Sequence, residues 1–387
     1  MSATPLGGYV NIFLSNDRLL DLLAPRTPDL GRGKLSIIEP FSANVGKPLH
    51  IGHLCPSSVG QALINVHRYF GWKVISDNHL GDWGGLFGKL IVGYQRYGNP
   101  VELQKDAVEH LLEVYVAITA AAEADPAIEQ ECRDAFRELS LGRVDYMELW
   151  ATFTHLTIAE ANKLIARVHV HCDVAVGESF FAGLSLPKIG THPDLVYSMQ
   201  SVIEELVELG IASCNEDGSI GVVFSDEAKI PSCILAKRDG ATGYLASDLA
   251  CMKYRMTNGW NPTKIIICTD VRQELHFKQL FWITDTWLEL SDWGKSLTTP
   301  PEFIHAKNGF IKLKDGAMST RKGNIIRLAD LLDEAVVRIQ KVIAEKGTVL
   351  ASSDAESIGI GAVKYSYLMQ DAIRDTVFDW DKALSLE

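Results

Sequence analysis

The sequence predicts an α/β fold in which a doubly wound parallel sheet is split by a mostly helical insertion. Three observations support this prediction. A buried strand over residues 35–41, a helix over 50–70 and a second strand over 72–76 have the order of a parallel β–α–β unit. Helical periodicity dominates from about residue 93 to 230. The pattern of a buried strand then returns at Lys264–Asp270.

The residues that bound each element agree with this order. The first long helix begins just after Pro48, a residue that suits a helix start, and stops at Gly71. Upstream, residues 8–15 alternate like a strand, and a short apolar helix candidate covers 17–23. A linker rich in proline and glycine follows. The chain therefore opens with a strand that lacks a domain of its own.

The insertion is expected to be helical apart from one hairpin. A polar turn around 215–218 joins strand-like runs at 211–214 and 220–224. After about residue 325 the chain is helical again. The helices expected in the insertion cover residues 101–124, 126–141, 142–167 and 193–210.

Composition limits the classes of protein to which the chain can belong. Its 387 residues are 47% apolar and 22% charged, the balance of a globular protein with a sizeable core. The formal net charge of −12 argues against non-specific DNA binding, but a local basic patch can still meet a nucleic acid. No apolar run approaches the roughly 20 residues of a membrane span, so we expect no membrane association.

The seven cysteines are scattered, and no pair is spaced C-x-x-C, so neither a zinc ribbon nor a thioredoxin-like site is signalled. Their odd number, without a secretory leader, predicts reduced thiols in a cytoplasmic protein. His169, His171 and Cys172 alternate in a way that suits one face of a strand. A plain strand and a metal site both fit that alternation.

Two histidines begin the helix that follows the first buried strand. In His50-Ile-Gly-His53 they share one face of the first turn, and Gly52 leaves room for a ligand to touch the backbone. Free N–H groups and the positive end of the helix dipole favour a phosphate there, to which imidazoles can donate hydrogen bonds. A capped helix and an H-x-x-H metal pair fit the same residues.

A second group of candidate residues lies roughly 265 residues later, in Ala317-Met-Ser-Thr-Arg-Lys-Gly-Asn324. This loop has small residues, two adjacent cations and a glycine. Arg321 and Lys322 are placed to hold the β- and γ-phosphates of ATP and to stabilise a leaving pyrophosphate. A solvated basic loop is the alternative.

Together the two motifs resemble the paired signature of class I aminoacyl-tRNA synthetases, on a Rossmann-like nucleotide-binding fold. The residues between them are similar to arginyl-tRNA synthetases, and the resemblance runs from about residue 8 to residue 387. The segments that carry it are Glu39–Asn44, Val45–His50, Asn78–Gly84, Tyr244–Asp248, Val271–His276 and Met318–Gly323.

This resemblance implies roles for individual residues. The residues that it implies for catalysis are His50, His53, Lys47, Arg321 and Lys322. Those that it implies for binding arginine are Glu39, Ser42, Asn44, Tyr244, Asp248 and Gln273. Those that it implies for binding ATP are His50, Gly52, His53, Asp270, His276, Phe310, Met318 and Ser319.

The chemistry of arginine agrees with the implied pocket. A guanidinium is planar, always charged and carries five donors, so its discrimination from lysine needs carboxylates placed for forked hydrogen bonds. Glu39 at a strand end and Asp248, four residues after Tyr244, are such carboxylates. Such a pocket rejects analogues that lack the matching donors, by roughly 10⁴-fold or more. Surface charge or helix capping is the alternative for both residues.

The chain departs from the family pattern in two ways. The lysines that usually stand at the positions of Ala317 and Thr320 are absent. In arginyl enzymes a lysine just before the histidine motif compensates, and Lys47 stands there. The second departure concerns the ends: the sequence resembles a catalytic core that lacks most of the N-terminal domain and the anticodon-binding domain, either excised or naturally minimal.

The resemblance divides the chain into five expected regions. Residues 1–33 are a remnant of the N-terminal tRNA-elbow domain with its linker, and 34–92 are the first half of the catalytic domain. Residues 93–230 are a helical connective insertion, 231–325 the second catalytic half with the signature loop, and 326–387 a helical stem-contact region. The cations expected to meet the acceptor stem, unless they form a solvated face, lie in His305–Lys322 and at Lys341, Lys346, Lys364 and Arg374.

The expected function is that of an arginine–tRNA ligase. The carboxylate of L-arginine attacks the α-phosphate of ATP, and the arginyl group passes from the adenylate to the 3′ end of tRNA(Arg). Mg²⁺ accompanies ATP without a dedicated protein metal site, and we expect a monomer. The resemblance also implies that tRNA must bind before the adenylate forms. The alternatives are a nucleotidyltransferase acting on a small substrate without RNA, and a weak or inactive arginine- or ATP-binding fragment that serves as a sensor or interaction module.

Overall fold

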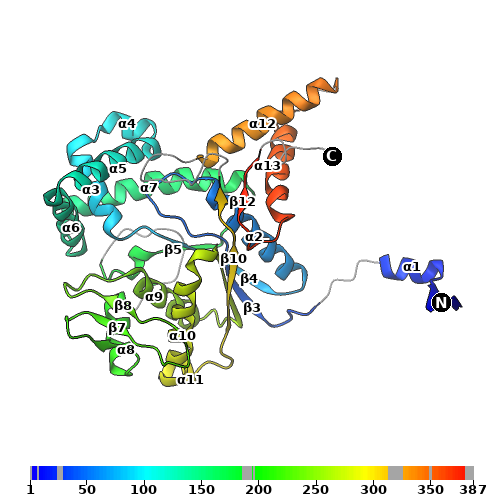
Figure 1. Cartoon of the computed structure of the whole chain (residues 1–387), viewed down its shortest axis with the longest axis horizontal. Helices are drawn as coiled ribbons and strands as arrows, with labels where there is room; N and C mark the ends of the chain where they lie inside the picture. Colours follow the sequence, from blue (N-terminus) through cyan, green and yellow to red (C-terminus); the bar gives the residue numbers. More distant parts are fainter. Residues whose placement is uncertain are drawn as a thin grey trace.

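A five-stranded parallel sheet forms the centre of the computed structural model (Figure 1). The chain runs from the central strand β3 to β4 and β5 on one side, and later to β9 and β10 on the other. This order confirms the predicted doubly wound sheet, and ligands of such sheets bind where the direction of winding changes. In spatial order the strands are β10 (Glu302–Asn308), β9 (Lys264–Asp270), β3 (Leu35–Glu39), β4 (Lys73–Leu80) and β5 (Val174–Gly177).

The structure describes most of the chain, and the signature loop predicted at 317–324 lies outside the described residues. Within the described part, no helix is both long and apolar enough to cross a membrane. The described ranges are residues 2–6, 8–23, 29–184, 194, 197–312, 326–347 and 351–379.

Alternate residues of the central strands bury apolar side chains on both faces of the sheet. Ile38 and Ile266 pack against α2 through Ile64, whereas Ile37 and Ile265 join the core formed with α9 and α10. The strands therefore read as continuous apolar runs because helices cover both faces. The helices that provide this cover are α2 (Ile51–Tyr69), α9 (Tyr244–Thr257) and α10 (Glu274–Leu290).

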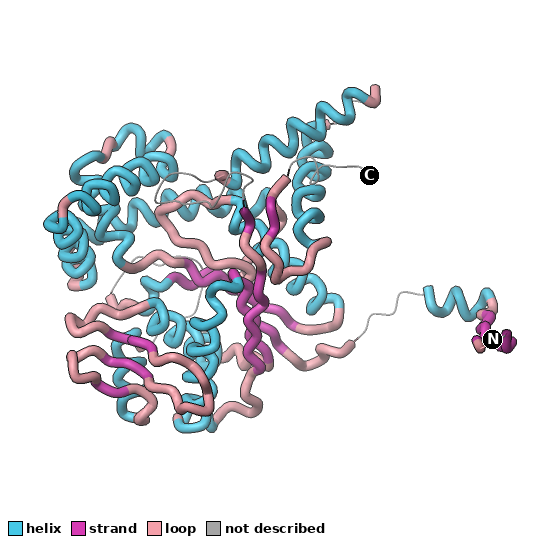
Figure 2. The backbone as a smooth tube through the Cα atoms, in the orientation of Figure 1, coloured by secondary structure: helices cyan, strands magenta, loops and turns pink. Residues whose placement is uncertain are grey.

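Five helices lie between β4 and β5, and Figure 2 shows them as a helical group beside the sheet. Asn99, Asp106 and Asp125 cap three of them by accepting a backbone N–H with the side chain. The cap at Asp106 divides the single helix predicted over 101–124 into two. The five helices are α3 (Gly85–Tyr97), α4 (Pro100–Lys105), α5 (Ala107–Ala124), α6 (Pro126–Ser140) and α7 (Val144–Arg167).

The strand expected from the alternation at 168–172 was wrong. This segment is the turn that ends α7: Val168 and Val170 donate backbone hydrogen bonds to Leu164 and Ile165 of that helix. His169 adopts a left-handed φ of 52°, a conformation common just past a helix end. The strand begins only at Val174. The alternating polarity of residues 168–172 therefore comes from the end of a helix and the extended segment that follows it.

The hairpin expected around 215–218 is confirmed as the antiparallel pair of β6 and β7, to which β8 adds a third strand. Strand β9 also has the predicted bounds. The elements that surround the hairpin are η1 (Glu178–Phe181), α8 (Met199–Glu208), β6 (Ser213–Cys214), β7 (Ile220–Val222) and β8 (Cys233–Ala236).

The two ends of the chain differ in how they relate to the sheet. Near the C-terminus, α12 and α13 pack on α2 around a core that includes Leu331 and Ile360. Near the N-terminus, an antiparallel hairpin and a helix are drawn apart from the sheet (Figure 1), and every residue of β2 is exposed. The remaining elements are β1 (Ser2–Leu6), β2 (Tyr9–Phe13), α1 (Asn16–Leu23), η2 (Val271–Gln273), α11 (Asp292–Lys295), β11 (Ile311–Lys312), α12 (Leu328–Glu345), α13 (Ser352–Leu368) and β12 (Thr376–Val377).

Candidate active site

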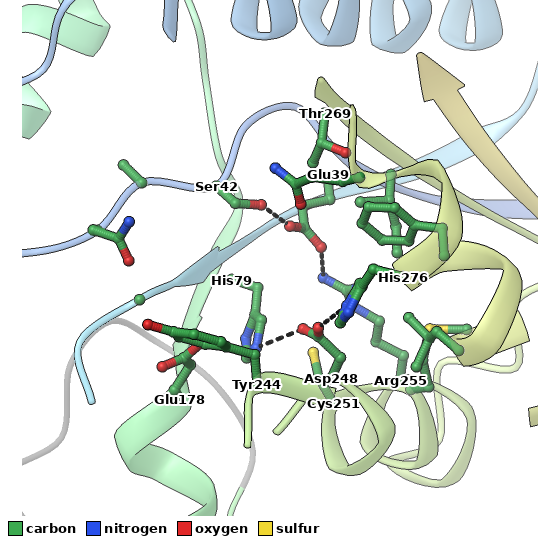
Figure 3. Close-up of a pocket in the computed structure, with 18 of the residues that line it drawn as sticks. Glu39, Ser42, His79, Glu178, Tyr244, Asp248, Cys251, Arg255, Thr269 and His276 are labelled. Carbon is green, nitrogen blue, oxygen red and sulfur yellow. Dashed lines mark hydrogen bonds and ion pairs between the residues drawn. The ribbon is translucent and has the colours of Figure 1, made fainter. Parts of the chain in front are cut away.

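A cavity of about 510 Å³ opens at the carboxyl ends of the sheet strands (Figure 3). This is the position at which doubly wound sheets bind ligands. Its walls come from the ends of β3, β4 and β9 and from one face each of α9 and α10. All six residues predicted to bind arginine line it: Glu39, Ser42, Asn44, Tyr244, Asp248 and Gln273.

Asp248 lies between two histidines. Its Oδ2 is 2.6 Å from Nε2 of His276, and its Oδ1 is 3.4 Å from Nε2 of His79. Burial alone would raise the pKa of Asp248, but the hydrogen bonds from His276 and His79 hold it below the ordinary value. The carboxylate is therefore ionised at neutral pH and ready for a cation.

His79 is held rigidly in this group. Its Nδ1 lies 2.8 Å from the carbonyl oxygen of Val176, to which it donates, so Nε2 faces Asp248. Burial lowers the pKa of His79, but Cys251 and Asp248 beside it raise the pKa well above the ordinary value. Sequence analysis assigned His79 no role, although it lies in the quoted segment Asn78–Gly84.

At the opposite wall, Glu39 is held by an internal arginine. Nη2 of Arg255 lies 2.6 Å from Oε2 of Glu39, and Nε of Arg255 lies 2.7 Å from Oδ2 of Asp77. The Ser42 hydroxyl donates to the other oxygen of Glu39. Arg255 is only 1% exposed, and an unpaired charge there would be costly. The Glu39 carboxylate is therefore fixed in orientation, although its negative charge is already paired with Arg255.

Glu178 is a carboxyl group of the cavity for which the described residues provide no partner. It follows the last residue of β5 and is 9% exposed. Among the described residues, none forms a hydrogen bond or ion pair with its side chain. Burial raises its pKa to about 8; His79 opposes this shift, and Asp248 and Asp82 add to it. A buried, unpaired carboxyl in a cavity indicates a cationic ligand.

Close backbone approach fixes Asn44 beside the cavity. Residues 44 and 81 form a parallel bridge, and the Gly81 N–H donates to the carbonyl of Ala43 at 2.9 Å. A Cβ at Gly81 would lie 2.5 Å from Oδ1 of Asn44, so a larger residue would displace the Asn44 amide. The quoted Gly81 therefore makes room for the Asn44 amide.

The histidine turn forms a reciprocal cap at the start of α2. Nδ1 of His50 accepts from the Gly52 N–H at 3.0 Å, and Nδ1 of His53 accepts from the His50 N–H at 3.0 Å. An acceptor Nδ1 in a neutral imidazole requires its proton on Nε2. The predicted capped helix and the predicted phosphate site are thus compatible, because each ring caps with one nitrogen and keeps a donor on the other.

Both imidazoles are neutral at physiological pH. Burial, and then the charge of Lys47, lowers the pKa of His50 to about 4. Burial, and then His50, lowers the pKa of His53 to about 3, although the backbone hydrogen bond opposes this shift. Neutral donors can stabilise charge that develops on a phosphate without holding a counter-ion in the ground state.

Lys47 lies in the loop before this turn and points to the helical insertion. Its Nζ is 4.4 Å from the ring centroid of Tyr115 on α5. Within the described ranges no carboxylate pairs with Lys47. The ammonium is therefore held near His50 with its charge intact.

The predicted ATP residues fall into separate groups. Asp270 forms two hydrogen bonds with the Arg272 guanidinium, which lies 3.9 Å from the Phe310 ring centroid. His276 lines the cavity and lies against Asp248, so it stands with the residues predicted to bind arginine. The predicted phosphate-loop residues outside the described part are Arg321, Lys322, Met318 and Ser319.

Two further expectations concern metals and RNA. In the described part, no three His, Cys, Asp or Glu side chains are grouped to hold a metal ion. Of the cations expected at an acceptor stem, Lys307 pairs with Glu274 at 2.8 Å. Lys364 donates to the carbonyl of Val168 at 2.6 Å, and burial lowers its pKa. Lys364 is therefore a structural contact between α13 and the end of α7, not a free phosphate ligand.

Sequence reasoning missed three residues of the cavity, for different reasons. Glu178 had a usable signal, since it ends a parallel strand, but the strand was expected some residues too early. His79 lay in a family segment without an assigned role. Arg255 had no signal, because a charged residue inside a helix pattern normally faces solvent.

Comparison with known proteins identifies a matching family and similar relatives. The family described as tRNA synthetases class I (R), catalytic domain, matches residues 23–380. The arginine–tRNA ligase of Fusobacterium nucleatum is 37% identical over 98% of this chain and 64% of its own length. That of Clostridium kluyveri is 36% identical over 99% of this chain and 65% of its own length. The chain thus spans somewhat under two thirds of these curated relatives.

Solved structures share the fold. The arginyl-tRNA synthetase of Plasmodium falciparum superposes with a TM-score of 0.72 at 20% identity, over all of this chain and 64% of that one. The Thermus thermophilus arginyl-tRNA synthetase also gives 0.72, at 19% identity, over all of this chain and 67% of that one. At these identities the likeness supports the fold alone.

Proposed function

The chain belongs to the family of class I tRNA synthetases for arginine, as a catalytic domain, and on that premise we propose that it is an arginine–tRNA ligase core. It activates L-arginine with ATP and transfers the arginyl group to the 3′ end of tRNA(Arg). The observation that carries the proposal is the cavity in which all six predicted arginine residues meet.

The charges of the cavity support a guanidinium ligand. Asp248 is ionised, and Glu178 is a buried carboxyl with no partner among the residues that the structure describes. Tyr244 adds a phenol one helical turn before Asp248. A guanidinium offers several donors in one plane and satisfies two carboxylates at once, which a lysine ammonium does less well. Glu178 and Asp248 therefore take the guanidinium, and Glu39, Ser42 and Asn44 take the amino acid end.

The histidine turn supports the chemistry on ATP. An oxygen of the arginine carboxylate forms a bond to the α-phosphorus, and the bond to the bridging oxygen breaks to release pyrophosphate. His50 and His53 donate from Nε2 to charge that develops on the α-phosphate, and Lys47 takes the other phosphates. Mg²⁺ enters with ATP as part of that substrate. Arg321 and Lys322 assist from the signature loop.

The second step needs only positioning. A 3′-terminal ribose hydroxyl of tRNA(Arg) attacks the carbonyl carbon of the adenylate, and AMP leaves. We place the reaction in the cytoplasm, which agrees with seven cysteines that are all free. We also propose that the chain acts as a monomer. The five regions given above remain predictions.

Arginine-dependent exchange of pyrophosphate into ATP tests the proposal, with and without tRNA(Arg). We expect exchange that requires arginine and increases with tRNA. Exchange with arginine alone would show that this core escapes the tRNA requirement implied by its family. Exchange with another amino acid would assign a different substrate.

A failure of exchange under both conditions would overturn the proposal. Equilibrium binding of arginine and Mg·ATP would then test the alternative, a binding fragment that acts as a sensor. The histidine turn favours the enzyme over the sensor, since a binding fragment has no need of the two Nε2 donors at the start of α2.

A further inference from the structure

We propose that Tyr115, on the helical insertion, is a positioning residue that holds Lys47 for the phosphates of ATP without neutralising it. This inference rests on the proposed function. If it is correct, the helical insertion contributes to adenylate formation through the ring of Tyr115. The motifs around His50 and the signature loop do not include Tyr115.

The first argument is the geometry of the contact between Lys47 and Tyr115. The Lys47 ammonium lies 4.4 Å from the ring centroid, well inside the distance at which an aromatic face attracts a cation. Tyr115 is only 6% exposed and is fixed in the core of the insertion. The ring therefore has little freedom, and it limits the rotamers open to a long, flexible lysine.

The second argument is that Lys47 has an aromatic ring, and not a carboxylate, as its partner. A carboxylate would hold Lys47 equally well, but it would cancel the charge that phosphates need. An aromatic ring attracts through its quadrupole and leaves the full positive charge. That charge reaches the histidine turn, since it contributes to the low pKa of His50. The ring therefore orients the Lys47 ammonium and leaves its charge available to a phosphate.

The backbone just before Lys47 is fixed by the same insertion. The Gly46 N–H donates to Oγ1 of Thr157 on α7 at 3.3 Å. Gly46 has a φ of 84°, and a Cβ there would lie 2.7 Å from Cδ1 of Leu90 on α3. Three helices of the insertion therefore define the path of this loop. Tyr115 adds the contact to the side chain that the loop presents.

Helix α5 also contacts the far side of the histidine turn. Glu109, near the start of α5, pairs with Nη1 of Arg327 at 2.6 Å. Arg327 forms an antiparallel bridge with His50. Helix α5 therefore contacts both Lys47, which precedes His50, and Arg327, which bridges to His50, and a displacement of α5 would shift Lys47 relative to the imidazoles.

The test compares Tyr115→Leu with Tyr115→Phe in arginine-dependent pyrophosphate exchange. Phenylalanine keeps the ring face, and we expect it to retain activity within about two-fold. Leucine removes the ring, and we expect kcat/KM for Mg·ATP to fall by between about 2-fold and about 30-fold, the range of cation–π energies. KM for arginine should stay unchanged in both variants.

A matched control lies in the same insertion. Tyr146 on α7 is also buried and carries the Arg143 guanidinium 3.9 Å from its ring centroid. Tyr146→Leu removes a buried ring of the same kind away from Lys47. It should leave kcat/KM for Mg·ATP unchanged even if it lowers stability, which a denaturation curve measures separately.

A double-mutant cycle with Lys47→Met decides between positioning and packing. If Tyr115 acts through Lys47, adding Tyr115→Leu to Lys47→Met causes no further loss. An equal loss in both backgrounds, a loss that falls equally on arginine and ATP, or a failure of phenylalanine to rescue would overturn the inference. If the unmodified chain shows no exchange, the proposed function fails. The same variants are then compared by the Kd for Mg·ATP, and an unchanged Kd in Tyr115→Leu overturns the inference separately.

Discussion

Nη2 of Arg255 lies 2.6 Å from Oε2 of Glu39, across the base of the cavity. The two side chains are almost completely buried, and Nε of the same guanidinium binds Asp77 at 2.7 Å. One internal arginine therefore serves two carboxylates, of which Glu39 is a proposed contact of the substrate. The pair joins α9 to the central strand β3, so it links the stability of the fold to the shape of the site.

Replacement of Arg255 by methionine should destabilise the chain strongly. It leaves the carboxylates of Glu39 and Asp77 buried without a cation, a situation that costs about 3–5 kcal/mol in the free energy of unfolding. Urea denaturation measures this change. Arg272→Met is the control, because Arg272 pairs with Asp270 at the surface with 63% of its side chain exposed. Exposed pairs contribute at most about 1 kcal/mol. Equal effects of the two substitutions would contradict the account of the buried pair.

Replacement of His50 by asparagine should separate capping from catalysis. Asparagine is a good N-cap and can accept the Gly52 N–H as Nδ1 of His50 does, so stability should change little. It lacks the donor at Nε2, so kcat for exchange should fall by roughly 10²–10³-fold. His50→Ala loses both functions and should also lose about 1 kcal/mol of stability. Full activity of the asparagine variant would exclude a donor role.

Replacement of Asp248 by alanine should weaken arginine use far more than ATP binding. The carboxylate is held ionised between His79 and His276, and its loss removes the negative charge opposite a guanidinium. The measurement is KM for arginine in exchange, beside Kd for Mg·ATP by calorimetry. Asp145→Ala, at an exposed pair with Arg143, is the control and should change neither value. Equal loss of arginine and ATP would count against the assigned role of Asp248.

Replacement of Glu178 by glutamine should remove a pH dependence of stability. In the folded chain burial raises the pKa of Glu178 to about 8, whereas the ordinary pKa of a glutamate is 4.5. Between these values the folded chain binds the proton and the unfolded chain does not. The free energy of unfolding of the native chain therefore falls as pH rises from about 5 to about 8, at up to about 1.4 kcal/mol per unit. Urea denaturation at several pH values should show this fall relative to Glu178→Gln.

Arginine should cancel this effect. A bound guanidinium favours the ionised form of Glu178, so binding below about pH 8 releases a proton. Calorimetry in buffers of different ionisation enthalpy detects that proton, and the Glu178→Gln variant should not release it. A difference in stability that does not change between pH 5 and 8 would show that Glu178 ionises freely in the empty cavity.

The local sequence pattern was enough to predict the central elements of the fold. Lys264–Asp270 is a continuous apolar run bounded by polar residues, and strand β9 has the same bounds. The same logic failed at 168–172, where the left-handed His169 ends α7. Alternation over five residues does not distinguish a strand from a capped helix end followed by an extended tail. The cap at Asp106 was missed because helical periodicity continues across it.

Many residues of the proposed arginine cavity were also predictable from sequence, because they lie at strand ends and helix starts. Glu39 ends β3, and Tyr244 begins α9. A parallel sheet brings all such ends to one edge, so residues from distant motifs meet without any pairing information. Family resemblance then selected which of these residues to name.

The sequence by itself determined most of the elements, and many of the residues that stand at the edge of the sheet where a ligand can bind. Only the tertiary structure decided the partners. Arg255 is 216 residues from Glu39, and Tyr115 meets Lys47 only because α5 packs beside the loop before α2. Glu178 is unpaired because no described cation reaches it. Periodicity records whether a side chain is buried, whereas the identity of its neighbour depends on how elements far apart in the chain pack together.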